Sequence, residues 1–176
     1  MAAKWTDFVA GAVLTAAQLN DVLDNFQDIA IFNETQASGT NGGTFTSGSY
    51  VKRTLNTTVV NNITGCSIAS SVITLPAGTY SVFASAPAYR VAAHKIKLRN
   101  TTASTDIAIG ASCFTDASDA SVVTHSVLQT RIVLSASTTI ELQHRAGTTK
   151  ADNGFGQPST FGDTEIYSQI TIARIA

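Results

Sequence analysis

Along most of the chain, hydrophobic and polar residues alternate with a period of two. The alternation is clearest over residues 79–86, 92–99, 122–134 and 139–145, and shorter Thr- and Val-rich runs lie at 51–60, 71–75 and 165–175. This period places successive side chains on opposite faces of a strand. Clusters of Gly, Pro, Asn, Asp and Ser separate the runs, as turns require. The pattern predicts a mainly β protein with antiparallel strands, built as a sandwich or barrel, because no βα repeat favours a parallel sheet.

The N-terminal segment, residues 1–33, has a different period. Thr15 is a suitable N-cap, Gln18 follows at the capping-box spacing, and apolar residues recur every three or four positions, which predicts one amphipathic helix over residues 15–32. The apolar stripe comprises Leu14, Leu19, Val22, Leu23, Phe26 and Ile29. No second helix is predicted to cover this stripe. It therefore serves to associate with copies of itself as a short coiled coil, or to dock on another surface, and the sequence leaves both open.

Three parts are expected from these patterns. The helical segment 1–33 is followed by a linker, residues 34–49, in which Gly, Ser, Thr and Asn dominate. The β domain is expected to occupy residues 50–176. A chain of 176 residues is long enough to bury one sizeable core of this kind.

Composition removes several classes of partner. The formal net charge is −1 and only 13% of residues are charged, so no general attraction to nucleic acid or to an anionic membrane is expected. No apolar run is long enough to span a membrane.

Cys66 and Cys113 are far apart and lie in no metal or redox motif. We expect two reduced, partly buried thiols from folding in a reducing cytoplasm, although pairing cannot be settled from sequence.

The basic residues are concentrated in one stretch. Four of the eleven Lys and Arg residues fall within residues 85–100. With a period of two, Lys95, Lys97 and Arg99 share one face of a strand, and His94 shares the other face with apolar residues. This indicates a strand with one solvated or interfacial face. Nucleic-acid binding is not favoured, because further basic neighbours and interleaved aromatic residues are missing.

His94 and His144 are the two polar residues on otherwise apolar faces. Two imidazoles could begin a metal site, but a third ligand is not evident. We therefore expect each histidine to be hydrogen-bonded, either in the core or at a subunit interface. Neither a metal ion nor another cofactor is expected.

Catalytic patterns are weak. No nucleophile-elbow spacing is present, and the only glutamates are Glu34, Glu141 and Glu165, which offer no obvious pair for glycoside hydrolysis. We expect a protein that is not an enzyme.

Three blocks of sequence carry a resemblance when taken in order. They are "GTFTSGSYVKRTLNT", "ITLPAGTYSVFASAPAYRVAAHKIKLRNTT" and "LQHRAGTTKADNGFGQPSTFGDTEIYSQITI". Together they resemble the C-terminal domain of a family of phage tail-fibre and minor tail proteins. The opening "WTDFVAGAVLTAAQLND" is similar to the leading segment common in phage virion proteins. The resemblance implies a jelly-roll sandwich of the C1q and tumour-necrosis-factor type that assembles as a tight trimer, and it supplies no activity.

The resemblance implies a virion protein assembled in the host cytoplasm. With one short helix upstream, a long shaft is not expected, and the N-terminal segment is expected to dock directly on other virion proteins. A trimer gives a role to inward-facing or basic polar residues, and the candidates for bonds between subunits are Arg90, His94, His144 and Arg145. The leading functional hypothesis is a tail-tip or tail-fibre component that binds a host-surface glycan or cell-wall polymer noncovalently.

Two loops, residues 101–120 and 146–163, are the candidates for binding that polymer. Phe155 and Phe161 are the aromatic residues in them that could stack on sugars, although anchoring of their loop to the sandwich is the favoured role for both. The alternative function is that of a capsid decoration protein or head spike, which stabilises the particle and needs no receptor.

Overall fold

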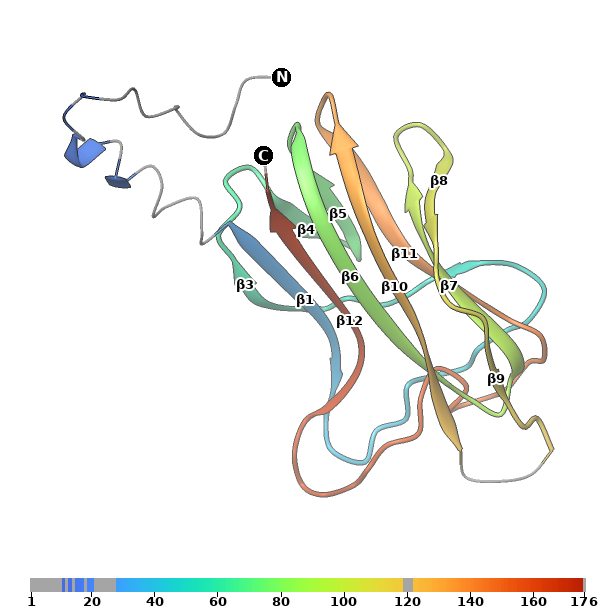
Figure 1. Ribbon diagram of the computed structural model, residues 1–176. Coiled ribbons are helices and arrows are strands. Elements are labelled where there is room, and N and C mark those ends of the chain that lie inside the picture. Colours follow the sequence, from blue (N-terminus) through green and yellow to red (C-terminus); the bar gives the residue numbers. More distant parts are fainter. Residues whose placement is uncertain are drawn as a thin grey trace.

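Two antiparallel sheets packed face to face form the body of the protein (Figure 1). The computed structural model describes residues 28–118 and 122–175, together with residues 11, 13, 15–17 and 19–20. The strands are β1 (Ile29–Gln36), β2 (Val51–Lys52), β3 (Thr57–Asn61), β4 (Ser67–Ala69), β5 (Val72–Leu75), β6 (Gly78–Tyr89), β7 (Ala92–Asn100), β8 (Thr105–Ile109), β9 (Cys113–Thr115), β10 (Val123–Leu134), β11 (Thr138–Ala146) and β12 (Glu165–Arg174).

The five-stranded sheet has the order β10-β6-β12-β1-β3, and the seven-stranded sheet has the order β4-β5-β11-β7-β8, with β2 added to β11 and β9 added to β7. Neighbouring strands in both sheets are antiparallel. Because strands distant in sequence are neighbours, as β6 and β12 are, the chain crosses repeatedly between the sheets. The predicted antiparallel sandwich is confirmed.

The core lies between the sheets and is formed by alternate residues of the long strands. Val82 and Ala84 of β6 face inward beside Ile170 and Ile172 of β12, and all four are fully buried. Leu142 belongs to the opposing layer. Each fully buried aliphatic side chain of this size stabilises the fold by about 1.5–3 kcal/mol, so the alternation seen in the sequence is the main source of stability.

The predicted strand at 51–60 is two strands, β2 and β3. The chain leaves the ladder at residues 53–56, where the amide of Arg53 donates to the carbonyl of Leu142 and the Arg53 side chain turns into the interior. The predicted loop at 101–120 is also divided, because it contains β8 and β9. Both of these short strands pair with β7, at Lys97–Asn100 and Ala92–His94.

The prediction for the N-terminal part is wrong beyond residue 28. Residues 16, 17, 19 and 20 are helical, and the Leu19 amide donates to the Thr15 carbonyl at 3.1 Å. Ile29, however, begins β1, which lies between β12 and β3 and contributes Phe32 to the core. The β domain therefore includes residues 29–36, and Ile29 belongs to a strand instead of a helical stripe.

Other members of the predicted stripe fall differently. Leu19 is about half exposed, whereas Leu14, Val22, Leu23 and Phe26 lie outside the described residues. Whether the stripe self-associates or docks stays a prediction.

The predicted linker at 34–49 is also wrong in part. Residues 34–36 are the end of β1. The following segment is held against the β11–β12 loop by backbone bonds, among them Phe45 to Lys150 in both directions and the Phe155 amide to the Gly43 carbonyl. Backbone bonding of this density fixes a Gly-rich segment that by composition alone would be flexible.

Candidate functional site

The loops that join the strands gather at the two ends of the sandwich. Residues 37–50 and 147–164 lie together at the lower end in Figure 1, whereas the turn at residues 101–104 lies at the upper end. The register agrees, because Ala146 pairs with His94 at one end of the β7–β11 ladder and Ile140 pairs with Asn100 at the other. The predicted receptor loop at 101–120 is therefore divided between the two ends: its turn at 101–104 lies far from residues 147–164, whereas β9 pairs with Ala92–His94 at the same end as those residues.

A buried ion pair lies inside the lower end. Arg53 Nη2 donates to Glu34 Oε2 at 2.5 Å and to the Phe155 carbonyl at 3.2 Å, and both charged side chains are almost fully buried. The Arg53 guanidinium also lies 4.1 Å from the centre of the Phe155 ring. Burial lowers the pKa of Arg53, and the charge of Glu34 opposes that shift. One arginine thus links β1, the residues after β2 and the β11–β12 loop.

Aromatic rings continue this arrangement toward β11. Phe45 stacks on Phe155 with 4.2 Å between ring centres, and its other neighbour is His144 at 4.7 Å. Phe45 is fully buried. We call the set Glu34, Arg53, Phe45, His94 and His144 the polar core.

The two histidines of the polar core are bonded to each other. His94 Nδ1 lies 3.0 Å from His144 Nε2, and His94 Nε2 lies 2.7 Å from Thr124 Oγ1. Among the described residues, none forms a hydrogen bond with His144 Nδ1. An unpaired buried acceptor is better tolerated than an unpaired donor, which assigns the tautomers. His144 donates from Nε2 to His94 Nδ1, and His94 donates from Nε2 to Thr124.

Both imidazoles are held neutral. Burial, followed by the charge of Arg53, lowers the pKa of His144 to about 2. Burial, followed by the charges of His125 and Arg53, lowers the pKa of His94 to about 4. A proton added to either ring would place a second positive charge beside Arg53 in a region with one carboxylate, Glu34.

Glu165 fixes the β11–β12 loop at the same end. Its carboxylate accepts bonds from the amides of Gly39, Ser159 and Thr160 and from the Ser159 hydroxyl, at 2.9–3.1 Å. These backbone donors lower the pKa of Glu165 to about 2. Gly156 is needed beside this anchor, because a Cβ there would lie 2.2 Å from Tyr167 Cδ1.

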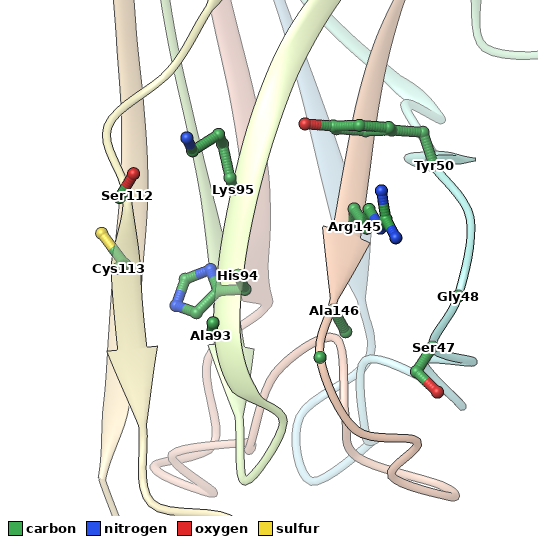
Figure 2. A pocket seen from close by; sticks show the side chains of 11 residues that line it. Ser47, Gly48, Tyr50, Ala93, His94, Lys95, Ser112, Cys113, Arg145 and Ala146 are labelled. Carbon is green, nitrogen blue, oxygen red and sulfur yellow. The ribbon is translucent and has the colours of Figure 1, made fainter.

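A pocket opens on the outer face of the seven-stranded sheet, next to the polar core. Its volume is about 430 Å³. Figure 2 shows Tyr50 and Arg145 on one side of it and Lys95, Ser112 and Cys113 on the other. Lys95 and Arg145 have no acidic partner among the described residues, and no Asp or Glu lines the pocket. We call this cavity the basic pocket.

The predicted intersubunit residues separate into two pairs. His94 and His144 are buried within a single chain, where they bond each other, in line with the expected hydrogen bond in the core. A further contact of either histidine with another subunit stays a prediction. Arg90 donates from Nη2 to the Ser118 carbonyl at 2.6 Å, and Arg145 is exposed at the basic pocket.

The two candidate sugar-stacking residues also differ. Phe155 is partly buried against Phe45 and Arg53 and anchors its loop. Phe161 is 85% exposed and is the one of the two that a ligand could reach.

The remaining expectations concern thiols, metals and membranes. Cys66 and Cys113 are free and half-buried, and burial raises the pKa of Cys66 to about 11. Within residues 28–118 and 122–175, no three His, Cys, Asp or Glu side chains gather as metal ligands. No helix among the described residues is long and apolar enough to cross a membrane.

Sequence reasoning missed four residues of this region: Phe45, Tyr50, Arg53 and Glu34 as its partner. Arg53 and Glu34 are 19 residues apart and lie on neither face of a regular alternating run. A lone arginine in a Thr-rich strand gives no signal that distinguishes it from a surface residue.

Comparisons with known proteins address the fold. No protein-family model matches the chain, and no curated protein matches it. Among solved structures, the globular domain of zebrafish complement 1qA protein is similar with a TM-score of 0.55 and 12% identity, covering 85% of this chain and 98% of that one.

Two further solved structures have the same fold. Murine APRIL at pH 5.0 has a TM-score of 0.51 and 6% identity, covering 84% of this chain and 99% of that one. PRD1 vertex protein P5 has a TM-score of 0.52 and 13% identity, covering 85% of this chain and 97% of that one. The domain is a jelly-roll sandwich of the C1q and tumour-necrosis-factor type, and the resemblance to phage tail proteins rests on sequence alone.

Proposed function

We propose that this protein is a structural component of a phage virion, assembled as a homotrimer, that binds the host surface at the tail tip. The observation that carries the proposal is a jelly-roll fold similar to that of a phage vertex protein, in a chain whose ordered blocks resemble phage tail proteins. Binding is noncovalent, and weak single sites act together in the assembled particle.

The surface we assign to the trimer is the outer face of the five-stranded sheet. Three registered rows cross it, each from β10 through β6 and β12 to β1. They are Arg131–Ser81–Ala173–Ile29, Gln129–Phe83–Thr171–Ile31 and Val127–Ser85–Gln169–Asn33. Arg131 is the one charged residue in these rows, and Phe83 and Val127 are 47% and 42% exposed. A flat sheet face with little charge and an exposed central aromatic residue suits a second copy of the chain.

Phe83→Lys is expected to dissociate the trimer. The substitution places a charge in the middle row of the proposed interface, where a buried unpaired ammonium is strongly unfavourable. Sedimentation equilibrium should give three times the chain mass of 18.4 kDa for the wild type and a single chain mass for the variant, with a loss in affinity of at least a hundredfold.

The matched control is Phe114→Lys, which adds the same charge at a phenylalanine that is 66% exposed on β9, in the other sheet. It should leave the trimer intact. A wild-type monomer at micromolar concentration, or equal effects of the two substitutions, would contradict the assigned face.

We further propose that the protein has no catalytic activity. Each glutamate is engaged in a structural contact: Glu34 with Arg53, Glu141 with Lys52 at 3.8 Å, and Glu165 with three backbone amides. Carboxylates bound in this way are not free to act as a general acid and a nucleophile. Release of reducing sugars from host envelopes by the purified protein would overturn this part of the proposal.

A second candidate function is that of a capsid decoration protein or head spike. It is favoured by one observation, the fold likeness to a protein named as a vertex protein of PRD1. Gold-tagged antibody raised against the full chain discriminates the two functions on purified virions. Label at the tail tip supports host binding, whereas label over the head or its vertices supports decoration and refutes the tail-tip proposal. In either case the N-terminal segment is proposed to dock on other virion proteins.

A further inference from the structure

The basic pocket contains two positive side chains from neighbouring strands, which extend toward opposite sides of it in Figure 2. Lys95 on β7 and Arg145 on β11 are registered partners in the antiparallel ladder. Like charges at directly opposed positions of a sheet repel each other and destabilise it. The pocket therefore holds two uncompensated positive charges, and a bound anion would reduce the repulsion between them.

The other basic residues on this sheet face are neutralised. Lys97 and Arg99 both bond Asp106, at 2.9 Å and 2.8 Å. Lys52 lies 3.8 Å from Glu141. Neither an ion pair nor a side-chain hydrogen bond is formed by Lys95 or Arg145 with the described residues. The missing counter-charge is therefore specific to the pocket and does not extend over the whole basic strand.

The walls of the pocket suit a sugar. The Tyr50 ring forms one side, already 4.1 Å from the Lys97 ammonium, and the hydroxyls of Ser47 and Ser112 line the rim (Figure 2). Aromatic rings present an apolar surface, and hydroxyls and cations fix orientation, which is the usual make-up of a small-molecule site. A cavity of about 430 Å³ accommodates one or two sugar units.

The floor of the pocket is rigid. Ala93 and Gly147 line it, and the Gly147 amide donates to the Ala93 carbonyl at 2.7 Å. His94, which also lines the pocket, is bonded to His144 and Thr124, so the strand that bears Lys95 is fixed from the core side. A site whose charged residues stand on two paired strands is preorganised for its ligand.

We propose that the basic pocket binds an anionic sugar unit, bearing a carboxylate or a phosphate, of a host-envelope polymer, with the anion between Lys95 and Arg145. This inference rests on the proposed function, because it names the ligand class for host binding. The pocket lies on the outer face of the seven-stranded sheet, and the proposed trimer contact uses the outer face of the other sheet. Three pockets therefore stay open in a trimer and can engage one polymer together.

Calorimetric titration of the full-length protein tests the proposal with four probes. Digalacturonic acid carries carboxylates and α-1,4-galactobiose is its neutral counterpart, while glucose 6-phosphate carries a phosphate and glucose is its neutral counterpart. We expect at least one anionic probe to bind at least ten times more tightly than its neutral counterpart. Whichever anionic probe binds more tightly identifies the charged group of the ligand as a carboxylate or a phosphate. Binding should weaken at least tenfold between 50 and about 500 mM NaCl, because surface charges are screened.

The variant Lys95→Gln/Arg145→Gln should lose at least tenfold in affinity for the anionic probe, with an unchanged or raised melting temperature, since it removes a repulsion. The matched control is Lys52→Gln/Arg99→Gln, which removes two charges from the same sheet face outside the pocket lining and should keep the affinity. Failure of both anions to bind, equal binding of the neutral sugars, or equal losses in the two variants overturns the proposal.

Adsorption of the protein to host cells separates this inference from the proposed function. If the wild type adsorbs and Lys95→Gln/Arg145→Gln adsorbs equally well, the pocket inference fails and host binding stands. If the protein binds the anionic probe through the pocket but does not adsorb to host cells, the pocket stands and host binding fails.

Discussion

Replacing Arg53 with methionine is expected to lower the free energy of unfolding by about 3–5 kcal/mol, since it leaves the buried carboxylate of Glu34 without a partner. Both side chains are almost fully buried, so water cannot take over the lost contact. The substitution also removes the bond to the Phe155 carbonyl and the contact with its ring. Urea denaturation at pH 7 measures the loss, and a domain of this size has a stability of about 5–15 kcal/mol.

The double variant Glu34→Leu/Arg53→Met guards against failure of the single variant to fold. With both charges removed, no buried ion is left unpaired, and most of the lost stability should return. Arg99→Met is the matched control: it breaks a solvent-exposed pair with Asp106, and the expected loss of stability is much smaller than that of Arg53→Met. If Arg53→Met and Arg99→Met were equally mild, the ion pair would not be the link between β1 and the β11–β12 loop that its geometry implies.

The long strands were predictable because each separates a buried face from an exposed one. The alternation of Tyr80, Val82 and Ala84 reports burial directly, as does that of Ile140 and Leu142. The period-two alternation did not reveal the start of β1. Its Ile29 continues the helical spacing of the preceding residues, and the bulge between Asn33 and Thr35 breaks its alternation.

The site was predictable only where a single strand carries the signal. His94 and His144 could be assigned to inner faces from periodicity, but their contact depends on the register between β7 and β11. The pairing of Arg53 with Glu34 depends on a crossing between sheets that local sequence does not encode. The sequence pattern placed Lys95 on a basic face. That Lys95 pairs with Arg145 in a pocket without an acidic residue follows only from the register between β7 and β11.

Stability is expected to fall by about 3 kcal/mol between pH 7 and pH 5, because two buried histidines bind protons only after unfolding. Unfolded histidine has a pKa near 6.5, and burial lowers the folded values to about 4 for His94 and about 2 for His144. A lowered folded pKa means that the stabilisation is complete above about pH 6.5. It is lost as the pH falls from there toward the folded values.

The expected loss of about 3 kcal/mol includes His94 at about half of its full contribution, because the side of the ring that bonds Thr124 lies nearer the surface. Titration of the carboxylates contributes little to the stability change between pH 7 and pH 5, since the lowered pKa values of Glu165 and Asp106 affect stability mainly below about pH 4.5. His125, whose pKa is also lowered by burial, adds to the slope in the same direction.

Urea denaturation at pH 7, 6 and 5 measures this slope, and His94→Gln/His144→Leu should remove most of it. Glutamine keeps a donor within reach of Thr124, and leucine fills the space beside Phe45 without a titrating group. The variant is therefore expected to be less stable than the wild type at pH 7 but to lose less than about 1 kcal/mol on reaching pH 5. His125→Gln removes the third histidine and should retain most of the wild-type slope, and if it instead flattened the curve, the pair His94 and His144 would not be the main source of the acid sensitivity.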